Sequence, residues 1–405
     1  MTERLVIFDT TLRDGEQAPG FSMGVDAKVR MARALEALGV DVVEAGFPVA
    51  SEADAEAVRR VALALERPVV AALARCADGD VDRAAWAVAP ARRSRIHTFI
   101  ATSDLHLQRK LRLTREACRD AAVAAIRRAR GYTDDVEFSA EDATRSDPDF
   151  LCRVVEDAID AGAGTINLPD TVGYSTPEEI AAFFRTVIGR VPNADRAIWS
   201  AHCHDDLGLA VANTLAAIGA GVRQVECTIN GIGERAGNAA LEEIVMAARV
   251  RPDRVPVAIG VESPRLFAAS QLLTELTGER VQSNKAIVGR NAFAHEAGIH
   301  QDGMLKDRRT YEIMRPEDVG VPSTTLVLGK HSGRHAVARR CEQFGLALSR
   351  QQLDEIYRRM VARADVQRHI SDDDLLGIAA DVAGVAPTPA GREAAGHEAG
   401  YGFGV

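Results

Sequence analysis

Eight short apolar segments recur along the first part of the chain, and a stretch with apolar residues at helical spacing follows each of them. We expect β-strands at residues 5–9, 42–46, 69–73, 95–100, 135–139, 165–168, 197–201 and 224–228. Two parallel strands must be joined by a long crossover connection, which is usually a helix. Strands that alternate with helices therefore indicate a parallel sheet. Eight such units within about 250 residues predict an α/β fold, the (β/α)₈ or TIM barrel.

The connections between these segments support the barrel. Residues 26–38 and 177–188 carry apolar residues at helical spacing. Glycines stand where helices should stop, at Gly39, Gly162, Gly164 and Gly221. The alternative, a doubly wound open sheet, would place a glycine-rich phosphate loop at residues 10–14, which contain no glycine. The glycine-rich stretch 231–237 follows the eighth strand with the wrong spacing, so we discount it as a dinucleotide site.

We divide the chain into three parts. Residues 1–282 are expected to form the barrel with a following linker, and residues 283–380 a mostly helical lid subdomain. The stretch 291–303 is polar and interrupted by glycines, which favours a lid that completes the site over a satellite subdomain. The basic segment 330–334 could meet a phosphate-bearing cofactor or begin a helix. Residues 381–405 are rich in Ala, Gly and Pro and predict a flexible tail.

Composition excludes several classes of protein. The net charge of −9 argues against a nucleic-acid or anionic-membrane partner. Six scattered cysteines without CxxC spacing indicate buried thiols in a reducing compartment. No apolar stretch approaches the ~20 residues that span a bilayer, and the N-terminus leads into a strand with no secretory signal. We therefore expect a cytoplasmic protein.

Polar residues gather at the carboxyl ends of the predicted strands, where barrel enzymes carry their chemistry. They are Asp14, Glu44, His97, Glu137, Ser139, Glu141, Asn167, Asp170, Thr171, His202, His204 and Asn238. A purely structural barrel does not require so many, and we expect the active site at this end.

Asp14, His202 and His204 are candidates for a metal site. Because the two histidines are two residues apart on one strand, both project toward the mouth, whereas Cys203 points outward. Two histidines and an aspartate that leave coordination positions open are typical of catalytic divalent-metal sites. These ligand types are compatible with Mg²⁺, Mn²⁺, Co²⁺ and Zn²⁺ alike. A lone histidine there would more often be an ordinary hydrogen-bonding residue. Asn238 could add a carbonyl ligand or stabilise a turn.

Arg13 directly precedes the proposed ligand Asp14. Its guanidinium could stabilise an alkoxide that develops on a carbonyl substrate. A salt bridge to Glu44 or Asp170 is the structural alternative and could coexist with catalysis.

Three further residues have open roles. Glu141 could be a base, an orienting group or a strand-end partner. His97 and Thr171 could hydrogen-bond to a substrate carboxylate, or could hold strand ends together.

Seven motifs together resemble one family. They are FDTTLRDGEQAPG (8–20), HTFIATSDLH (97–106), SAEDATRSDPDF (139–150), NLPDTVGYSTPEE (167–179), SAHCHDDLGLAVANTLAAIGAG (200–221), QVECTINGIGERAGNAALEE (224–243) and HEAGIHQDGMLKDRRTYEIMRPEDVG (295–320). The chain resembles the 2-isopropylmalate synthases, which belong to the metal-dependent Claisen-condensing barrels together with homocitrate and citramalate synthases. The resemblance covers about residues 4–380.

The resemblance implies an acyltransferase that condenses acetyl-CoA with 2-oxoisovalerate and hydrolyses the thioester, which yields 2-isopropylmalate and CoA in leucine synthesis. It implies a divalent metal held by Asp14, His202, His204 and Asn238. It implies a 2-oxo acid in a pocket formed by Arg13, His97, Ser139, Glu141 and Thr171, with Arg13 polarising the keto group. His300 and Tyr311 correspond to lid residues implicated in enolising acetyl-CoA. In such enzymes the lid typically covers the barrel of the partner subunit, which implies a homodimer.

Homocitrate or citramalate synthase is the alternative within the family, because a pocket discriminates one methylene by only about 1–3 kcal/mol. Lyases resembling 3-hydroxy-3-methylglutaryl-CoA lyase carry a cysteine in the loop after strand eight, and residues 231–238 contain none. The intact metal set disfavours a catalytically dead scaffold. Members of the family usually carry a C-terminal leucine-sensing domain. The sequence ends just after the linker-like stretch 381–405, so we do not expect leucine inhibition at such a domain.

Overall fold

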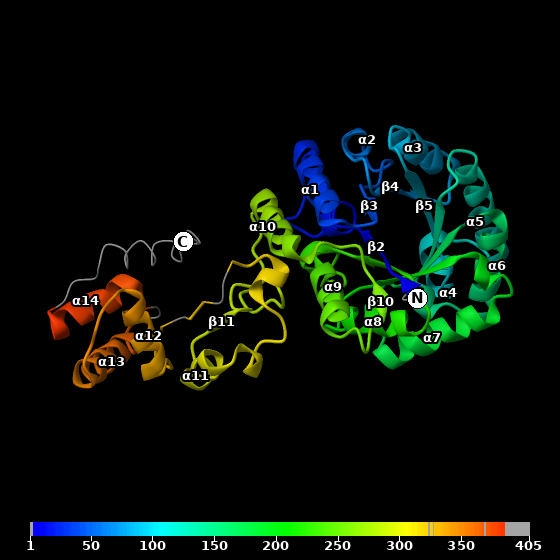
Figure 1. Cartoon of the computed structure of the whole chain (residues 1–405). Coiled ribbons are helices and arrows are strands. Elements are labelled where there is room, and N and C mark those ends of the chain that lie inside the picture. The colour runs from blue at the N-terminus through cyan, green and yellow to red at the C-terminus, as the bar shows by residue number, and fades with distance from the viewer. Residues whose placement is uncertain (1–2, 323–324, 327, 368–369, 385–405) are drawn as a thin grey trace. The chain divides into compact units, whose positions relative to one another are not determined.

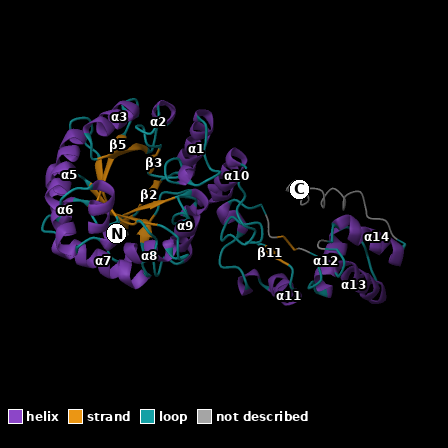
Figure 2. Ribbon diagram, turned by 180° about the vertical axis from the view of Figure 1, so that it is seen from behind, coloured by secondary structure: helices purple, strands orange, loops and turns teal. Residues whose placement is uncertain are grey.

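The computed structural model describes residues 3–322, 325–326, 328–367 and 370–384. The chain forms two compact units, Met1–Gln282 with Ala286–Val288, and Ser283–Lys285 with Gly289–Val405. The first unit is a closed barrel of eight parallel strands ringed by helices (Figures 1 and 2). Its strands are β2 (Val6–Asp9), β3 (Val42–Glu44), β4 (Val69–Arg75), β5 (Ser94–Ala101), β6 (Val136–Glu141), β7 (Thr165–Asp170), β8 (Ile198–Cys203) and β9 (Gln224–Cys227). The predicted TIM barrel is therefore confirmed.

The outer ring consists of amphipathic helices that bury one face against the strands. They are α1 (Val25–Leu38), α2 (Glu52–Ala64), α3 (Asp78–Val88), α5 (Arg115–Arg130), α6 (Pro148–Ala161), α7 (Pro177–Arg190), α8 (Ala210–Gly219) and α9 (Leu241–Val250). The three-residue helix α4 (Asp104–His106), between β5 and α5, has no buried residue. Helix α6 is representative. Asp147 caps its first turn by accepting the N–H of Phe150 at 2.8 Å, and Gly162 ends it in the left-handed conformation.

Short turns and a closing element complete the first unit. The turns are η1 (Gly15–Gln17), the π-helical turn η2 (Leu107–Leu111), η3 (Ala143–Arg145), η4 (Ala194–Arg196), η5 (Ile229–Gly231) and η6 (Ser263–Arg265). The sequence patterns did not predict that β1 (Glu3–Arg4) pairs in parallel with β10 (Val257–Ala258). Helix α10 (Leu266–Thr277), in the stretch that follows the barrel strands, packs against α1.

The second unit is mostly helical and has its own core. Its elements are β11 (Ala294–His295), α11 (Gly298–Lys306), η7 (Arg308–Thr310), η8 (Pro316–Val319), β12 (Thr325–Leu326), α12 (Arg334–Gln343), α13 (Arg350–Ala364) and α14 (Asp372–Ala383). Buried Phe344, Ile356, Met360 and Leu375 form the centre of that core. Helix α14 occupies residues 381–383, the first part of the predicted tail, and residues 385–405 lie outside the described residues.

In the part of the chain that the structure describes, no helix is both long and apolar enough to cross a membrane.

Gly39, at the end of α1, is a position where the barrel leaves little room for a side chain. It ends α1 at φ +89°, and an added Cβ would lie 2.9 Å from the carbonyl oxygen of Gly260. We expect Gly39→Ala to destabilise the protein by about 1–3 kcal/mol in chemical denaturation, because backbone strain and the clash add. Gly189→Ala, in the exposed last turn of α7 with open space around it, should instead stabilise by about 0.5–1 kcal/mol. Equal effects at both positions would contradict this account.

Candidate metal centre at the barrel mouth

The loop after β2 carries Arg13 and Asp14, and it folds back on Thr10. The carbonyl oxygen of Thr10 accepts the N–H of Arg13 at 3.1 Å, and its hydroxyl oxygen accepts the N–H of Asp14 at 3.3 Å. The buried ammonium of Lys28 on α1 forms an ion pair with Glu16 farther along the loop. These contacts fix both side chains above the end of β2.

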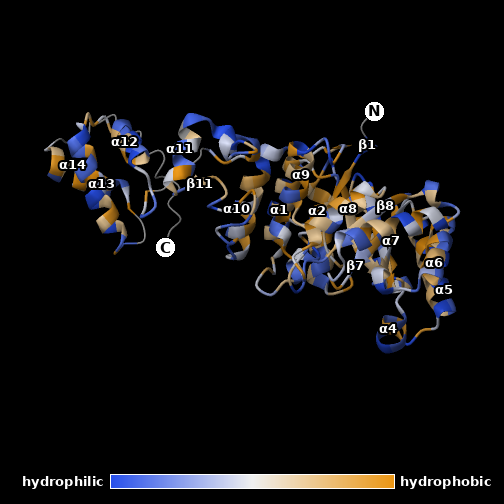
Figure 3. Ribbon diagram, turned by 90° about the horizontal axis from the view of Figure 1, so that it is seen from below, coloured by the Kyte–Doolittle hydropathy of each residue, from blue (hydrophilic) through white to orange (hydrophobic). Residues whose placement is uncertain are grey.

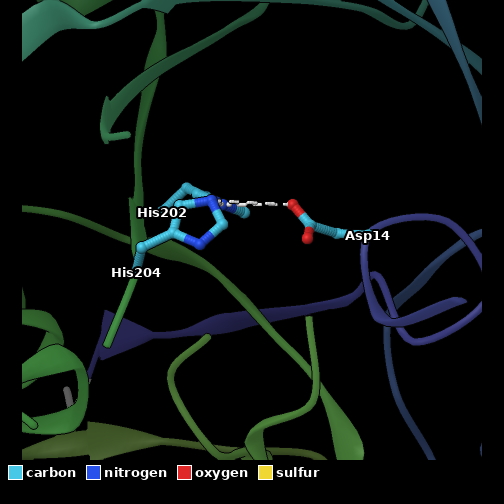
Figure 4. Close-up of side chains that lie close together, drawn as sticks. All are labelled: Asp14, His202 and His204. Carbon is cyan, nitrogen blue, oxygen red and sulfur yellow. Dashed lines mark hydrogen bonds and ion pairs between the residues drawn. The ribbon is translucent and has the colours of Figure 1, made fainter. Parts of the chain in front are cut away.

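Asp14, His202 and His204 converge on one point, as the sequence predicts (Figure 4). Oδ2 of Asp14 lies 3.5 Å from Nε2 of His202 and 3.8 Å from Nε2 of His204, and the two Nε2 atoms are 3.2 Å apart. All three side chains are buried. Residues almost two hundred positions apart therefore place three donor atoms around a common space.

The histidines are oriented so that their Nε2 atoms face this space. Nδ1 of His202 lies 2.7 Å from Oε2 of Glu226, and Nδ1 of His204 lies 3.1 Å from the carbonyl oxygen of Gly237. A carbonyl oxygen only accepts, so Nδ1 of His204 carries the proton and Nε2 presents its lone pair. Burial, and then the neighbouring His202, lower the pKa of His204 to about 4. A neutral imidazole held through Nδ1 is the form that binds a metal.

Asn238 stabilises a turn and leaves its carbonyl oxygen unpaired among the described residues. Its Nδ2 donates to the carbonyl oxygen of Ile232 at 3.1 Å, which stabilises the turn, while no described residue donates a hydrogen bond to its buried Oδ1. An added Cβ at Gly233 would lie 2.1 Å from Nδ2 of Asn238 and 3.1 Å from Oδ1 of Asp14, so only glycine leaves room there. The unpaired carbonyl oxygen, the carboxylate and two imidazoles form a donor set that fits a divalent cation.

Arg13 lies at the centre of a buried ion network. Its Nε donates to Oε2 of Glu44 at 2.6 Å and its Nη1 to Oδ2 of Asp14 at 2.9 Å, and Nη2 lies 3.8 Å from Oε2 of Glu226. Burial opposes the guanidinium charge, but the three carboxylates outweigh it and raise the pKa of Arg13. Of the two salt bridges considered from the sequence, the structure contains the one to Glu44. Asp170 instead accepts the N–H of Ser175 at 3.0 Å.

His97 holds three strands together. Its Nδ1 lies 2.7 Å from Oε1 of Glu44, and its Nε2 lies 2.6 Å from Oγ of Ser139. Burial lowers the pKa of His97, but Glu137, Glu44 and Glu226 outweigh it and raise the pKa to about 9. Charged His97 therefore donates from both nitrogens. Oγ of Ser139 also accepts from Asn167 at 2.8 Å, so its own proton is free to point elsewhere.

The other predicted barrel residues lie at the rim of the same cavity. Oγ1 of Thr171 accepts the N–H of Asp142 at 3.0 Å, which joins two strand ends. Glu141 pairs with Lys110 at 2.5 Å and with His106 at 3.5 Å. The cavity has a volume of about 290 Å³. Its lining includes Arg13, Asp14, His97, Ser139, Glu141, Thr171, His202 and His204.

His300 and Tyr311 belong to the second unit. Their ring centroids are 4.4 Å apart, and Tyr311 is 45% exposed. His295 packs edge-on against His300 at 6.4 Å, and its buried Nε2 has no hydrogen-bond partner among the residues that the structure describes.

The chain matches two family models. Residues 4–273 match the HMGL-like model, and residues 287–368 match the model described as homocitrate synthase post-HMGL domain-like. A 2-isopropylmalate synthase of Rhodopirellula baltica is 57% identical over 377 residues, which cover 93% of this chain and 72% of that protein. Another, of Carboxydothermus hydrogenoformans, is 58% identical over 373 residues, with coverage of 92% and 73%. This chain belongs to the 2-isopropylmalate synthase family.

Solved structures share the fold at much lower identity. Hydroxymethylglutaryl-CoA lyase from Pseudomonas aeruginosa matches with a TM-score of 0.60 at 22% identity, covering 70% of this chain and 97% of that one. The carboxyl transferase domain of Rhizobium etli pyruvate carboxylase matches with a TM-score of 0.53 at 16% identity, covering 97% and 59%. These likenesses support the barrel architecture alone.

Sequence reasoning missed several residues of the site in this family member. Glu226, which orients His202, was not singled out, although a carboxylate inside the apolar segment 224–228 was a usable signal. The apolar part of the cavity wall, Phe47, Leu73, Phe99 and Pro169, gave no signal, because such residues are normal in strands and loops.

Glu226→Gln should weaken divalent-metal binding by about 10–100-fold, because an amide holds the His202 ring less firmly than a carboxylate. Isothermal titration of metal into the metal-free protein measures this directly. Glu178→Gln, at an exposed position on α7, is the matched control and should leave the affinity unchanged. Wild-type affinity in Glu226→Gln would contradict the assigned role.

The raised pKa of His97 gives the stability a pH dependence of known sign. The contribution of charged His97 is fully present below pH 6.5, its unfolded pKa, and is lost as the pH rises through about 9. Thermal unfolding at pH 6.0 and pH 9.5 should therefore show His97→Gln much less stable than wild type at the lower pH and closer to it at the higher. His335→Gln, exposed in the second unit, should show no such change. A stability difference between wild type and His97→Gln that grows as the pH rises would contradict the raised pKa of His97.

Proposed function

We propose that this chain is an acyltransferase that condenses acetyl-CoA with 2-oxoisovalerate and releases 2-isopropylmalate and CoA. The observation that carries the proposal is a buried His₂Asp set beside Arg13, in a chain 56–58% identical to curated 2-isopropylmalate synthases. The family acts on small molecules, and the cavity at the mouth is of matching size.

The metal would be held by Asp14, His202 and His204, with Oδ1 of Asn238 as a further ligand. A divalent cation supplies Lewis-acid polarisation of a carbonyl oxygen when bound there. The donor set suits Mn²⁺, Mg²⁺, Co²⁺ or Zn²⁺.

Arg13 would stabilise the negative charge that develops on the keto oxygen of the 2-oxo acid during carbon–carbon bond formation. Glu44 and Asp14 hold its Nε and Nη1, so the guanidinium does not have to reorganise during the reaction. Such a fixed cation in a site closed to water is worth more than the same charge in solvent.

The 2-oxo acid would be oriented by Ser139 and Thr171. Because Ser139 already accepts from His97 and Asn167, its proton is available to a substrate carboxylate. In this arrangement His97 supports Ser139 and does not bind the substrate itself.

The apolar wall favours a branched alkyl side chain. Leu73, Phe99 and Pro169 line the cavity and would pack against the isopropyl group of 2-oxoisovalerate. The second carboxylate of 2-oxoglutarate would meet this wall without a cation, which disfavours homocitrate synthesis. Pyruvate, the substrate of citramalate synthesis, would leave part of the wall uncovered.

Acetyl-CoA would lose a methyl proton to a base among Glu141, His300 and Tyr311. The resulting enolate carbon attacks the keto carbon, and water then cleaves the thioester, which releases the CoA thiol. The half-exposed Tyr311 and the exposed Ile299 and Ile313 of the second unit suit a lid that covers the barrel of a partner subunit in a homodimer.

A thiol-release assay tests the proposal. The metal-loaded protein is mixed with acetyl-CoA and 2-oxoisovalerate, 2-oxoglutarate, pyruvate or 2-oxobutyrate. We expect the highest kcat/KM with 2-oxoisovalerate, a moderately lower value with 2-oxobutyrate, since each methylene contributes about 1–3 kcal/mol, and loss of turnover with a chelator. Preference for 2-oxoglutarate would replace the proposed substrate, and turnover that survives chelation would reject the mechanism.

A further inference from the structure

The segment between β5 and α5 forms an arm at the barrel mouth. It comprises residues 104–113, that is, α4, the π-helical turn η2 and the residues that follow. Because it continues directly from the carboxyl end of β5, it lies at the end that carries the metal centre. Figure 3 shows α4 standing out from the barrel on the side opposite β1. Arg112 adopts the left-handed conformation at φ 56°, which is uncommon for a residue with a side chain and frequent at functional sites.

One side of the arm is anchored at the rim of the cavity. Leu107 is buried, and its carbonyl oxygen accepts the N–H of Leu113 at 3.1 Å. Lys110 and His106 both face Oε1 of Glu141, at 2.5 and 3.5 Å, and Glu141 lines the cavity. The arm is therefore fixed next to the reacting centre.

The other side of the arm presents unneutralised positive charge. Arg109 and Arg112 are exposed, and among the described residues neither forms an ion pair. Other cations at the mouth differ: Arg145 is bound by Asp142 and Arg235 by Asp206, each through two hydrogen bonds. What distinguishes these two exposed guanidinium groups is their place on an arm at the end of the barrel that carries the cavity, beside Lys110 and His106.

The basic segment that the sequence suggested for a phosphate lacks such free charge. Lys330 pairs with Asp365 at 2.8 Å and Arg334 with Asp354 at 2.9 Å, and α12 begins at Arg334. Its alternative interpretation, the start of a helix, agrees with the structure. The 104–113 arm is the better candidate for binding an anion.

We propose that the 104–113 arm binds the nucleotide end of the acyl-CoA substrate, with Arg109 and Arg112 contacting its phosphates. This inference rests on the proposed function, which requires an acyl-CoA whose thioester enters the cavity while its phosphates remain outside. Guanidinium groups bind phosphate oxygens through paired hydrogen bonds. Exposed Leu105, 53% accessible, offers an apolar contact for the adenine or pantetheine part. The arm thus matches the mixed anionic and apolar chemistry of CoA.

The test compares acetyl-CoA with S-acetylpantetheine, which has the same thioester but no nucleotide phosphates. In the Arg109→Gln/Arg112→Gln double variant we expect the KM for acetyl-CoA to rise about tenfold with little change in kcat, since each exposed pair contributes up to about 1 kcal/mol. The KM for S-acetylpantetheine and for the 2-oxo acid should stay at the wild-type values. The KM for acetyl-CoA should also rise with ionic strength in wild type and do so less in the variant.

Arg127→Gln is the matched control. Arg127 is an exposed arginine in the last turn of α5, at the opposite end of the helix that follows the arm. It should leave all KM values unchanged. A double variant with wild-type KM for acetyl-CoA, or with equal losses for acetyl-CoA and S-acetylpantetheine, would overturn the inference.

Binding without turnover separates the inference from the proposed function. Titration of 3′,5′-ADP and of CoA into wild type and the double variant should show about tenfold weaker binding in the variant. Arm-dependent CoA binding by a protein that releases no thiol with any 2-oxo acid would reject the condensation but support the arm. Condensation at normal rates, together with CoA binding that is the same in wild type and the double variant, would support the proposed function and reject the role of the arm.

Discussion

The pairing of β2 with β9 closes the barrel, and the site depends on this closure. Val6 and Asp9 of the first barrel strand align with Gln224 and Cys227 of the last, so the carboxyl ends of all eight strands meet at one mouth. In the neighbouring pair, β8 and β9, His202 lies opposite Glu226, which places the orienting carboxylate beside this candidate metal ligand. Without the closure, Asp14 and the two histidines would lie at separate edges of an open sheet.

Charge balance is the second constraint on the mouth. Asp14 and Glu226 line the cavity there with Arg13 and His97, and Glu44, Glu137 and Arg95 are buried inside the barrel beside them. Burial alone would neutralise such groups, so the pairs stabilise one another, and the pKa of Glu137 is still raised to about 7 by its burial. Within the described part of the chain, Oε1 of Glu226 has no hydrogen-bond partner. An excess of carboxylate in a buried site is the electrostatic condition that a bound divalent cation would relieve.

Some features of the site were predictable from the sequence, and others were not. Asp14, His202 and His204 were predicted to meet because each follows or ends a strand, and strand ends are visible as apolar segments. Glu141 was correctly placed at the mouth, but its contacts with Lys110 and His106 depend on the arm, whose π-helical turn has no sequence signature. The pairing of β1 with β10 joins segments about 250 residues apart and only two residues long, too short for a pattern.

The sequence by itself determined the eight strand–helix units, the end of the barrel where polar residues gather, and the residue types of the candidate metal site. These follow from the period of apolar residues and from the residue types at strand ends, both of which are local. Only the tertiary structure decided that both nitrogens of His97 are engaged, that Glu226 supports His202, and that Leu73 faces the cavity. Those outcomes depend on the stagger of neighbouring strands, which is set when the barrel closes and which no single segment encodes.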